Sequence, residues 1–283
     1  MVLSYLFPDQ AAKIIDTMNN AAQSRVNAGV AFPSDAQAGL LLGKAVGLAV
    51  VAYAQQDGSG KPFTGSYPPS PGVWSSPNPV TPLAPQWKTW VLNTAGDFRL
   101  SAPPAFGSDA ANAQYASVKS LARTNTTNHL AWFWQPGFFQ PWLQQVDLEM
   151  FQNHLDTNPP LAARAYAYET IAQHDATLAC WDSKYTYLEL RPSQADPTIT
   201  TLFNNPQHPG YPSGHACASG GSAAIMSALF PADTALFNTM ANDAGNSTFD
   251  AGIHTQLDVS QGLALGTKVG QAVAVRAQSD GAK

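Results

Sequence analysis

Two histidines bracket a glycine- and proline-rich run in HPGYPSGH, residues 208–215. Glycine and proline predict a loop here that turns sharply into an alanine-rich helix over 215–230. The start of a helix exposes backbone N–H groups and a partial positive charge, and both favour a bound anion. The Ser213 hydroxyl and the Gly214 N–H would donate hydrogen bonds to it, and His215 could exchange a proton near neutral pH. This stretch therefore predicts a site for an oxyanion.

A pair of cations stands upstream in KYTYLELRP, where Lys184 and Arg191 are seven residues apart. Two helical turns would place both on one face, ~10 Å apart along the axis, so that they could converge on one small ligand. Pro192 disfavours helical geometry at Arg191, so we expect the helix to end there. Taken alone, this spacing fits a solvated helix face equally well.

A third candidate is DAGIHTQLD, residues 250–258, in which Asp258 follows His254 by four positions. At that spacing a carboxylate can hold the proton on one imidazole nitrogen and leave the other free as a nucleophile or ligand. A pair on a helix surface would have the same spacing.

In this order, Lys-x6-Arg-Pro, Pro-Ser-Gly-His and His-x3-Asp resemble the superfamily that joins type 2 phosphatidic acid phosphatases to vanadium-dependent haloperoxidases. An ordered set of motifs is far more specific than any one of them. The resemblance spans about residues 73–279 and is strongest to soluble bacterial haloperoxidase-like members, in stretches such as FRLSAPPAF and AGIHTQLDVSQGLALG. It implies an α-helical bundle, with the first two helices as less characteristic additions.

The resemblance also implies the role of each residue. The oxygens of vanadate, or of phosphate in the same site, would be bound by Lys184, Arg191, Ser213 and the backbone N–H of Gly214. His215 would be the acid–base residue. His254 would be the axial ligand to vanadium in a peroxidase or the phosphohistidine nucleophile in a phosphatase, and Asp258 would orient it.

His208 favours the peroxidase interpretation, because HPxYPSGH resembles the form in algal bromoperoxidases, where that histidine lies beside vanadate. The expected activity is the oxidation of a halide by hydrogen peroxide. The alternative is an acid phosphatase that hydrolyses phosphomonoesters through a phosphohistidine. Both take small-molecule substrates.

One position departs from the family pattern, which has Ser-Arg seven and six residues before the third-motif histidine. Here these positions are Ser247 and Thr248, and no arginine occurs between Arg191 and Arg276. A charge-assisted hydrogen bond contributes ~1.5–3 kcal/mol, so its loss weakens oxyanion binding about 10- to 100-fold. Either another cation substitutes, or the ligand carries less charge, or the chain is a non-catalytic member.

The sequence predicts that the elements that position these residues are helices. Helical patterns cover 9–27, 35–56, 108–124, 138–155, 160–181, 183–190, 215–230, 232–243 and 256–279. Strand signals are nearly absent, so the prediction is an all-α fold. Residues 57–86 hold eight prolines and four glycines, which predicts an ordered loop laid over the helical core. The length of 283 residues favours one domain.

Charge and hydropathy limit the partners. The net charge of −5 and the lack of a basic run argue against nucleic acid. The apolar stretch 38–54 is interrupted by Lys44 and looks too short to span a bilayer, so we expect a buried bundle helix and no transmembrane segment. Low charge would suit an exported protein whose leader is absent from this chain.

Cys180 and Cys217 are expected to be buried hydrophobic residues. The sequence leaves homo-oligomerisation open.

Overall fold

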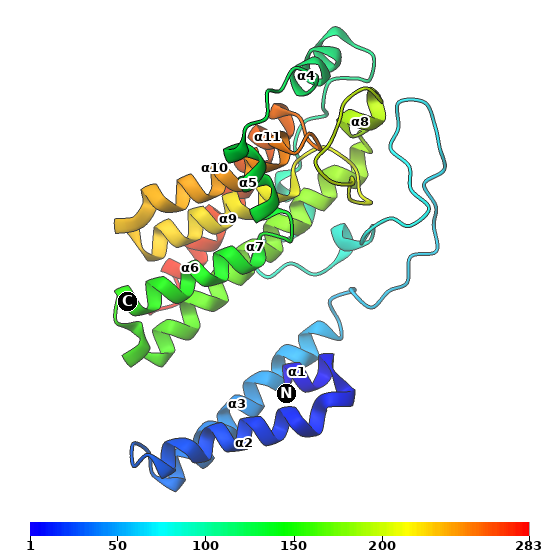
Figure 1. Cartoon of the computed structure of the whole chain (residues 1–283). Helices are drawn as coiled ribbons and strands as arrows, with labels where there is room; N and C mark the ends of the chain where they lie inside the picture. The colour runs from blue at the N-terminus through cyan, green and yellow to red at the C-terminus, as the bar shows by residue number, and fades with distance from the viewer. Residues whose placement is uncertain (283) are drawn as a thin grey trace. The chain divides into compact units, whose positions relative to one another are not determined.

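The computed structural model describes residues 1–282, and the chain divides into two compact units, Met1–Pro62 and Phe63–Lys283 (Figure 1). Every candidate site residue belongs to the second unit. The first unit holds the N-terminal helices that the motif resemblance does not cover. The single domain expected from the length stays a prediction.

The first unit consists of α1 (Val2–Leu6), a short 3-10 helix (Pro8–Gln10), α2 (Ala11–Asn27) and α3 (Pro33–Ala54). Proline occupies the first position of α3, where its missing N–H costs nothing. The Asp35 carboxylate accepts a hydrogen bond of 2.9 Å from the N–H of Phe32 and so caps the helix start.

The structure corrects two expectations for α3. The helix is longer than the apolar stretch, with 22 residues and a mean hydropathy of 1.5, which by length and composition alone is enough to cross a membrane. It is also not a buried bundle helix, because none of its residues is buried and large side chains such as Leu41, Leu42 and Val46 are exposed. Apolar composition therefore does not identify a core helix here.

The second unit is built from helices, and the described residues contain no strand beyond two isolated β-bridges. The all-α prediction is confirmed. Its helices are α4 (Asp109–Lys119), α5 (Asn125–Trp134), α6 (Phe139–Gln152), α7 (Pro159–Tyr187), α8 (Pro192–Ala195), α9 (Gly214–Leu229), α10 (Thr234–Asp250) and α11 (Gln256–Gln278).

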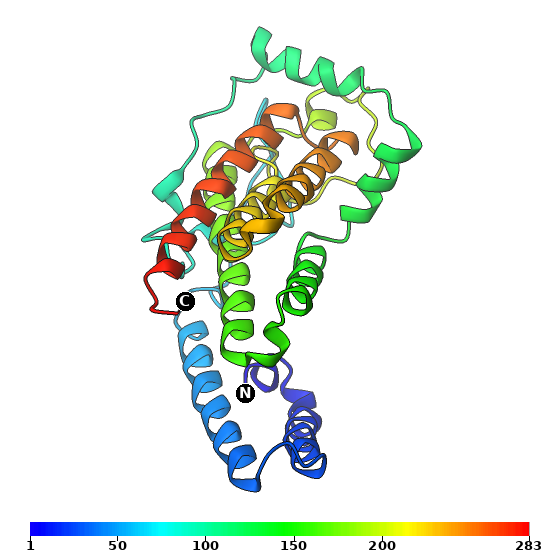
Figure 2. The same cartoon turned by 90° about the vertical axis from the view of Figure 1, so that its left-hand side faces the viewer.

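Helix α9 is the central element, since it packs against α7, α10 and α11 (Figure 2). Glycines let the backbones of α9 and α11 approach closely. A Cβ atom on Gly266 would lie 1.9 Å from the carbonyl oxygen of Cys217, and one on Gly270 would lie 2.4 Å from that of Gly221. The N–H of Ser213 also donates a 3.0 Å hydrogen bond to the carbonyl of Asp258, so the starts of α9 and α11 are joined directly.

The proline-rich loop is attached to the end of α7 and to the loop before α9. The N–H of Trp74 donates to the carbonyl of Leu188 at 2.7 Å, and that of Val80 donates to the carbonyl of Gln207 at 2.7 Å. Tyr185 and Trp181, both on α7, donate side-chain hydrogen bonds to the carbonyl of Val80. From Phe63 onward the loop therefore covers the helical core, as expected.

Several helices differ from the sequence prediction: α1 and α8 were not expected, and α4 ends at Lys119 rather than at 124. The two helices expected over 160–181 and 183–190 are one continuous helix, α7. Helix α10 continues to Asp250 rather than ending near 243. Helix α5 was not expected. The two cysteines are free and fully buried, as expected.

Candidate functional site

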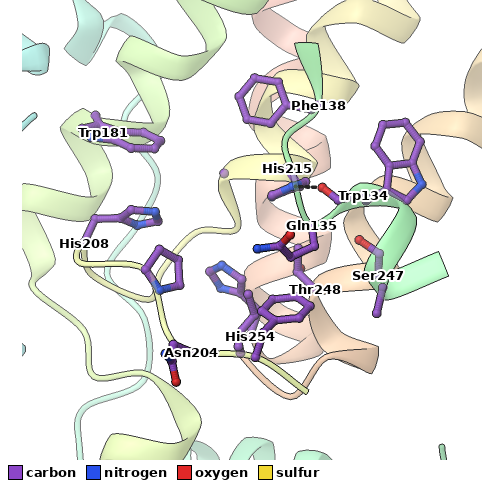
Figure 3. A pocket seen from close by; sticks show the side chains of 15 residues that line it. Trp134, Gln135, Phe138, Trp181, Asn204, His208, His215, Ser247, Thr248 and His254 are labelled. Carbon is purple, nitrogen blue, oxygen red and sulfur yellow. Dashed lines mark hydrogen bonds between the residues drawn. The ribbon is translucent and has the colours of Figure 1, made fainter. Parts of the chain in front are cut away.

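A cavity of about 310 Å³ lies where the ends of several helices of the second unit meet. Its wall includes five of the positions singled out by sequence: His208, Gly214, His215, Thr248 and His254. Figure 3 shows the three imidazoles around this cavity, with His208 beside Trp181 and His215 beside Trp134. Segments separated by more than a hundred residues thus contribute to one site.

His254 precedes α11, and the capping of that helix sets its orientation. Thr255 is the N-cap and accepts a 3.1 Å hydrogen bond from the N–H of Asp258. The Asp258 carboxylate in turn accepts a 2.8 Å bond from the N–H of Thr255 and lies 3.0 Å from Nδ1 of His254. Because a carboxylate can only accept, Nδ1 carries the ring proton and Nε2 keeps its lone pair.

The His254 ring is 2% exposed. Burial, together with the charges of Arg191 and Lys184, holds the pKa of His254 well below its usual range. The imidazole is therefore neutral at physiological pH. A neutral ring with a lone pair on Nε2 can act as a ligand or a nucleophile.

Arg191 lies against this ring and is fully buried. Its Nη1 is 3.0 Å from Nε2 of His254 and donates to the carbonyl of Ile253 at 2.9 Å. Its Nη2 is 3.0 Å from Nδ1 of His208. Burial lowers the pKa of Arg191 to about 10, so the guanidinium stays charged at neutral pH. One cation thus links two of the cavity's histidines.

Lys184 is also fully buried, but it lies behind the loop rather than on the cavity wall. Its Nζ donates to the carbonyls of Pro209 and Gly210 at 2.8 and 2.7 Å. Burial, and secondarily the charge of Arg191, lowers the pKa of Lys184 to about 8.

The two cations are not two turns apart on one helix face, as the spacing suggested. Helix α7 ends at Tyr187, where Leu188 takes a left-handed conformation (φ 50°), and Arg191 is the residue that precedes α8. The turn at Leu188, and not a shared helix face, brings Arg191 against His254.

Ser213 is the N-cap of α9 and accepts a 3.4 Å bond from the N–H of Ala216. Its hydroxyl lies 3.0 Å from that of Thr248 on α10. Gly214 is the first residue of α9, and its N–H belongs to the helical turn that has no intrahelical acceptor. The start of α9 therefore lies on the cavity wall at Gly214, and its binding of an anion stays a prediction.

His215 points toward the C-terminal end of α5. Its Nε2 lies 2.9 Å from the carbonyl oxygen of Trp134, so it carries the ring proton and donates to that oxygen. The Phe138 ring packs against the imidazole in an edge-to-face arrangement, with the two ring centroids 5.4 Å apart. Burial lowers the pKa of His215, although the bond to Trp134 opposes this shift. Proton transfer to a ligand would require the Nε2–H to leave Trp134.

Thr248, at the position where the motif resemblance implied an arginine, lines the cavity. Its hydroxyl donates to the carbonyl of Gly245 at 2.7 Å. No lysine or arginine lines the cavity in the part of the chain that the structure describes. A pair of hydroxyl groups, from Ser213 and Thr248, thus occupies this side instead of a replacement cation.

Sequence reasoning missed two features of the site. Trp134 and Phe138 were not among the candidate residues, yet both are buried and line the cavity, as does Trp181. Glu189 was given no role, and its carboxyl group lies within hydrogen-bonding reach of Asp258. No sequence spacing indicates that the aromatic residues line the cavity. Glu189 stands only two positions before Arg191, and this proximity could have identified it as a candidate site residue.

The arrangement suits a small oxyanion. Two carboxyl groups, those of Asp258 and Glu189, lie in the immediate surroundings of the two fully buried cations. Burial, followed by the charge of Asp258, raises the pKa of Glu189 to about 9, so at neutral pH only Asp258 offsets the two positive charges. The start of α9 and the His254 ring lie on the wall of the same cavity. Within residues 1–282 no group of three or more His, Cys, Asp or Glu side chains could chelate a metal ion. The site therefore has one candidate ligand nitrogen, Nε2 of His254, and its surroundings are positively charged.

No protein-family model matches the chain, and no curated protein matches it. Solved structures do. The chain is similar to the first bacterial vanadium-dependent iodoperoxidase, with a TM-score of 0.74 and 22% identity over 95% of this chain and 74% of that one. It is also similar to a bacterial vanadium-dependent chloroperoxidase in its holo form, with a TM-score of 0.68 and 15% identity over 97% and 79% of the two chains.

The apo form of a bacterial vanadium-dependent chloroperoxidase matches over 75% of this chain and 59% of that one, with a TM-score of 0.56 and 15% identity. The chain therefore has the fold of the bacterial vanadium-dependent haloperoxidases, as the motif resemblance implied.

Proposed function

We propose that this chain is a vanadium haloperoxidase-like enzyme, which binds vanadate in the cavity and oxidises a halide with hydrogen peroxide. The observation that carries the proposal is the burial of two cations next to the unprotonated Nε2 of His254. Arg191, at 0% exposure, has its Nη1 3.0 Å from that nitrogen, and Lys184, also at 0% exposure, lies behind the loop of Pro209 and Gly210. The fold it shares with bacterial iodo- and chloroperoxidases supports the same choice.

Electrostatics favours an anionic ligand. A buried charge without a counter-charge is expensive, and one ionised carboxylate, Asp258, cannot balance two cations. Asp258 already interacts with His254 and with the start of α11. An oxyanion in the cavity would supply the missing negative charge, so its binding energy would come mainly from relief of this imbalance.

The residues present fit vanadate. Arg191, Lys184, Ser213 and the N–H of Gly214 would hold its oxygens, and His254 would bind through Nε2. Arg191 Nη1 now lies 3.0 Å from that nitrogen, so it must turn toward the ligand's oxygens when His254 is engaged. Lys184 would have to exchange its bonds to the carbonyls of Pro209 and Gly210 for the ligand, because it does not line the cavity. Bound vanadate supplies the activation of peroxide and the oxidation of halide, while the protein supplies charge and orientation. His215 would move protons at Nε2 once released from Trp134.

An acid phosphatase is the second candidate, favoured by the neutral state of His254. A lone pair on Nε2, with the proton held on Nδ1 by Asp258, is what attack on phosphorus requires. The Nε2–P bond would form as the ester P–O bond breaks, and the leaving alkoxide would take a proton from the imidazolium form of His215. Burial lowers the pKa of His215, so this step requires acidic pH. Water would then cleave the phosphohistidine to give phosphate and free His254.

A non-catalytic protein on the same scaffold is the third candidate. Thr248 replaces a family arginine, and the Arg191 donors are already engaged by Ile253, His208 and His254. Both features weaken the case for tight oxyanion binding. This alternative predicts no saturable binding of phosphate or vanadate.

A paired assay separates the three candidates. One arm measures peroxide-dependent bromination and iodination with added orthovanadate, and the other measures hydrolysis of para-nitrophenyl phosphate without it. Halide oxidation that depends on orthovanadate and is inhibited by phosphate supports the proposal. Ester hydrolysis without halide oxidation would replace it with the phosphatase, and absence of both activities with no oxyanion binding would leave the non-catalytic protein.

A further inference from the structure

The backbone of Glu189 is fixed on both sides of the turn that follows α7. The left-handed Leu188 ends the helix, and its carbonyl accepts a 2.7 Å hydrogen bond from the N–H of Trp74. The carbonyl of Glu189 accepts a 2.9 Å bond from the N–H of Gly210. These backbone hydrogen bonds fix the position from which the Glu189 side chain projects. Glu189 lies between Lys184 and Arg191 in the sequence.

The carboxyl group of Glu189 meets that of Asp258. Glu189 as a residue is partly exposed, yet its Oε2 is shielded from solvent and no protein group donates to it. Oδ1 of Asp258 is shielded and unpaired in the same way. The two side chains are within hydrogen-bonding distance of each other. Two carboxylate ions would repel there, whereas a single shared proton satisfies both unpaired oxygens.

Local donors decide which residue holds the proton. Burial raises the pKa of Asp258 as well. However, its Oδ2 accepts the N–H of Thr255 at 2.8 Å and faces Nδ1 of His254 at 3.0 Å, and both interactions favour an ionised Asp258. No donor to the Glu189 carboxylate is found among residues 1–282. Burial, followed by the charge of Asp258, raises the pKa of Glu189 well above its usual range. Glu189 is therefore the neutral partner.

Other charged and titratable groups face this pair from the surrounding elements. Lys184 on α7 and Arg191 before α8 favour ionisation of Glu189, but burial and Asp258 outweigh them. Tyr115 on α4 and Tyr211 before α9 also face the pair, and burial raises the pKa of both phenols, so they stay neutral. His254 is neutral as well. The only negative charge in the group is then that of Asp258.

We propose that Glu189, as a neutral acid, donates a hydrogen bond to Oδ1 of Asp258 and thereby fixes the carboxylate that orients His254. Glu189 is a positioning residue, since it acts through Asp258 and touches no reacting atom. This inference rests on the proposed function for its catalytic meaning, although the Glu189–Asp258–His254 chain exists without it.

The neutral state of Glu189 also sets the charge of the pocket. Lys184 and Arg191 with one ionised carboxylate leave an excess of one positive charge. An ionised Glu189 would cancel that excess. The site could not compensate with a further cation, because Thr248 stands at the position of the arginine that the motif resemblance implies. A protonated Glu189 therefore preserves the attraction for an oxyanion.

The chain offers a direct spectroscopic test, because it contains only three glutamates: Glu149, Glu169 and Glu189. Labelling glutamate carboxyls with ¹³C gives three signals, and the one lost in Glu189→Gln belongs to Glu189. The inference expects this signal at the shift of a neutral carboxyl at pH 7. A Glu189 signal at the shift of an ionised carboxylate would overturn it, even if other variants fail to fold.

The second readout is the His254 ring, followed by ¹⁵N labelling of the six histidines. Glu189→Gln retains a donor and should keep the wild-type shifts of His254, with protonated Nδ1. Glu189→Leu removes the donor at similar size and should populate the other tautomer. Identical His254 shifts in a folded Leu variant would overturn the inference.

Phosphate titration of the same proteins then tests the proposed function separately. Glu189→Gln should bind phosphate as the wild type does, and Glu189→Leu about 10-fold more weakly. Shifted His254 signals without phosphate binding by any variant would retain the positioning chain and reject the proposed function. Wild-type binding that Glu189→Leu leaves unchanged would contradict the inference alone.

Discussion

The two sides of the cavity differ in charge although both are buried. On one side Arg191 contacts His254, and Lys184 lies behind them at 0% exposure. On the other side the hydroxyls of Ser213 and Thr248 face each other at 3.0 Å. Under the proposed function the charged side would both attract the oxyanion and form the bond to it, whereas the hydroxyl side offers only neutral hydrogen-bonding groups. We therefore expect both binding strength and chemistry to depend on the charged side, and only binding strength to depend on the hydroxyl side.

The charged side is tested most severely by His254→Ala. This change removes the only candidate for a bond to vanadium or phosphorus, so vanadate-dependent halide oxidation and phosphate-ester hydrolysis should both fall to background. His129→Ala, on the exposed surface of α5, is the matched control and should keep wild-type activity. Initial rates in the paired assay measure both variants. Full activity in His254→Ala would refute the assignment of the charged side.

The hydroxyl side is tested by Thr248→Arg, which restores the family cation. If the side chain reaches the ligand oxygens, phosphate and vanadate affinity should rise about 10- to 100-fold, since a charge-assisted hydrogen bond contributes ~1.5–3 kcal/mol. Thr248→Met has comparable length without charge and controls for loss of the bond to Ser213. Calorimetric titration measures both. Affinity in the arginine variant equal to or below that of the methionine variant would mean that the family roles do not carry over intact.

The pH dependence separates Lys184 from Arg191. The pKa of Lys184 is lowered to about 8 and that of Arg191 only to about 10, so raising the pH through 8 discharges the lysine first. Phosphate affinity should be constant below that pH and fall above it, by at most about tenfold per pH unit. Lys184→Met should bind weakly throughout and lose this decrease. An affinity that falls in the same way in the methionine variant would show that another group titrates.

His208→Ala should have the smallest effect of the four changes. It removes the neutral acceptor that lies 3.0 Å from Arg191 Nη2, which corresponds to about a 3- to 10-fold change in halide oxidation. Hydrolysis of a phosphate ester should be nearly unchanged, because Arg191 keeps its bond to Ile253. Rates for both reactions are compared in one preparation. An equal loss in both would place His208 with Arg191 as a general part of the charged side.

The charged side was predictable where the interactions are local in sequence. The four-residue spacing predicted a contact between His254 and Asp258, and the structure has it, although His254 precedes α11 and the contact belongs to the cap of that helix. The sharp turn into the helix after Pro212 was likewise predicted, and α9 begins at Gly214. The approach of Arg191 to His254 was not predictable from spacing, because it depends on the left-handed turn at Leu188, a conformation that a leucine does not signal.

The helix boundaries show the same limit. In α5, Trp132 and Phe133 are exposed while Ala131 and Trp134 are buried, so hydrophobicity does not mark the buried face. In α10, Ser247 and Thr248 are poor helix formers, yet each donates its hydroxyl back to a carbonyl one turn earlier. These bonds satisfy both hydroxyls within the helix, so α10 accommodates the two residues while they line the cavity. Helix propensity alone therefore placed the end of α10 too early.

The most direct test of the central claim is a calorimetric titration with orthovanadate of the wild type, Arg191→Met and Lys119→Met. Lys119 is a surface cation paired with Asp196, so the last variant controls for loss of a positive charge elsewhere. The account predicts saturable binding of one vanadate per chain, weakened about 10- to 100-fold in Arg191→Met and unchanged in Lys119→Met. No saturable binding by the wild type, or equal affinity in all three folded proteins, would contradict the claim that the buried cations form an oxyanion site.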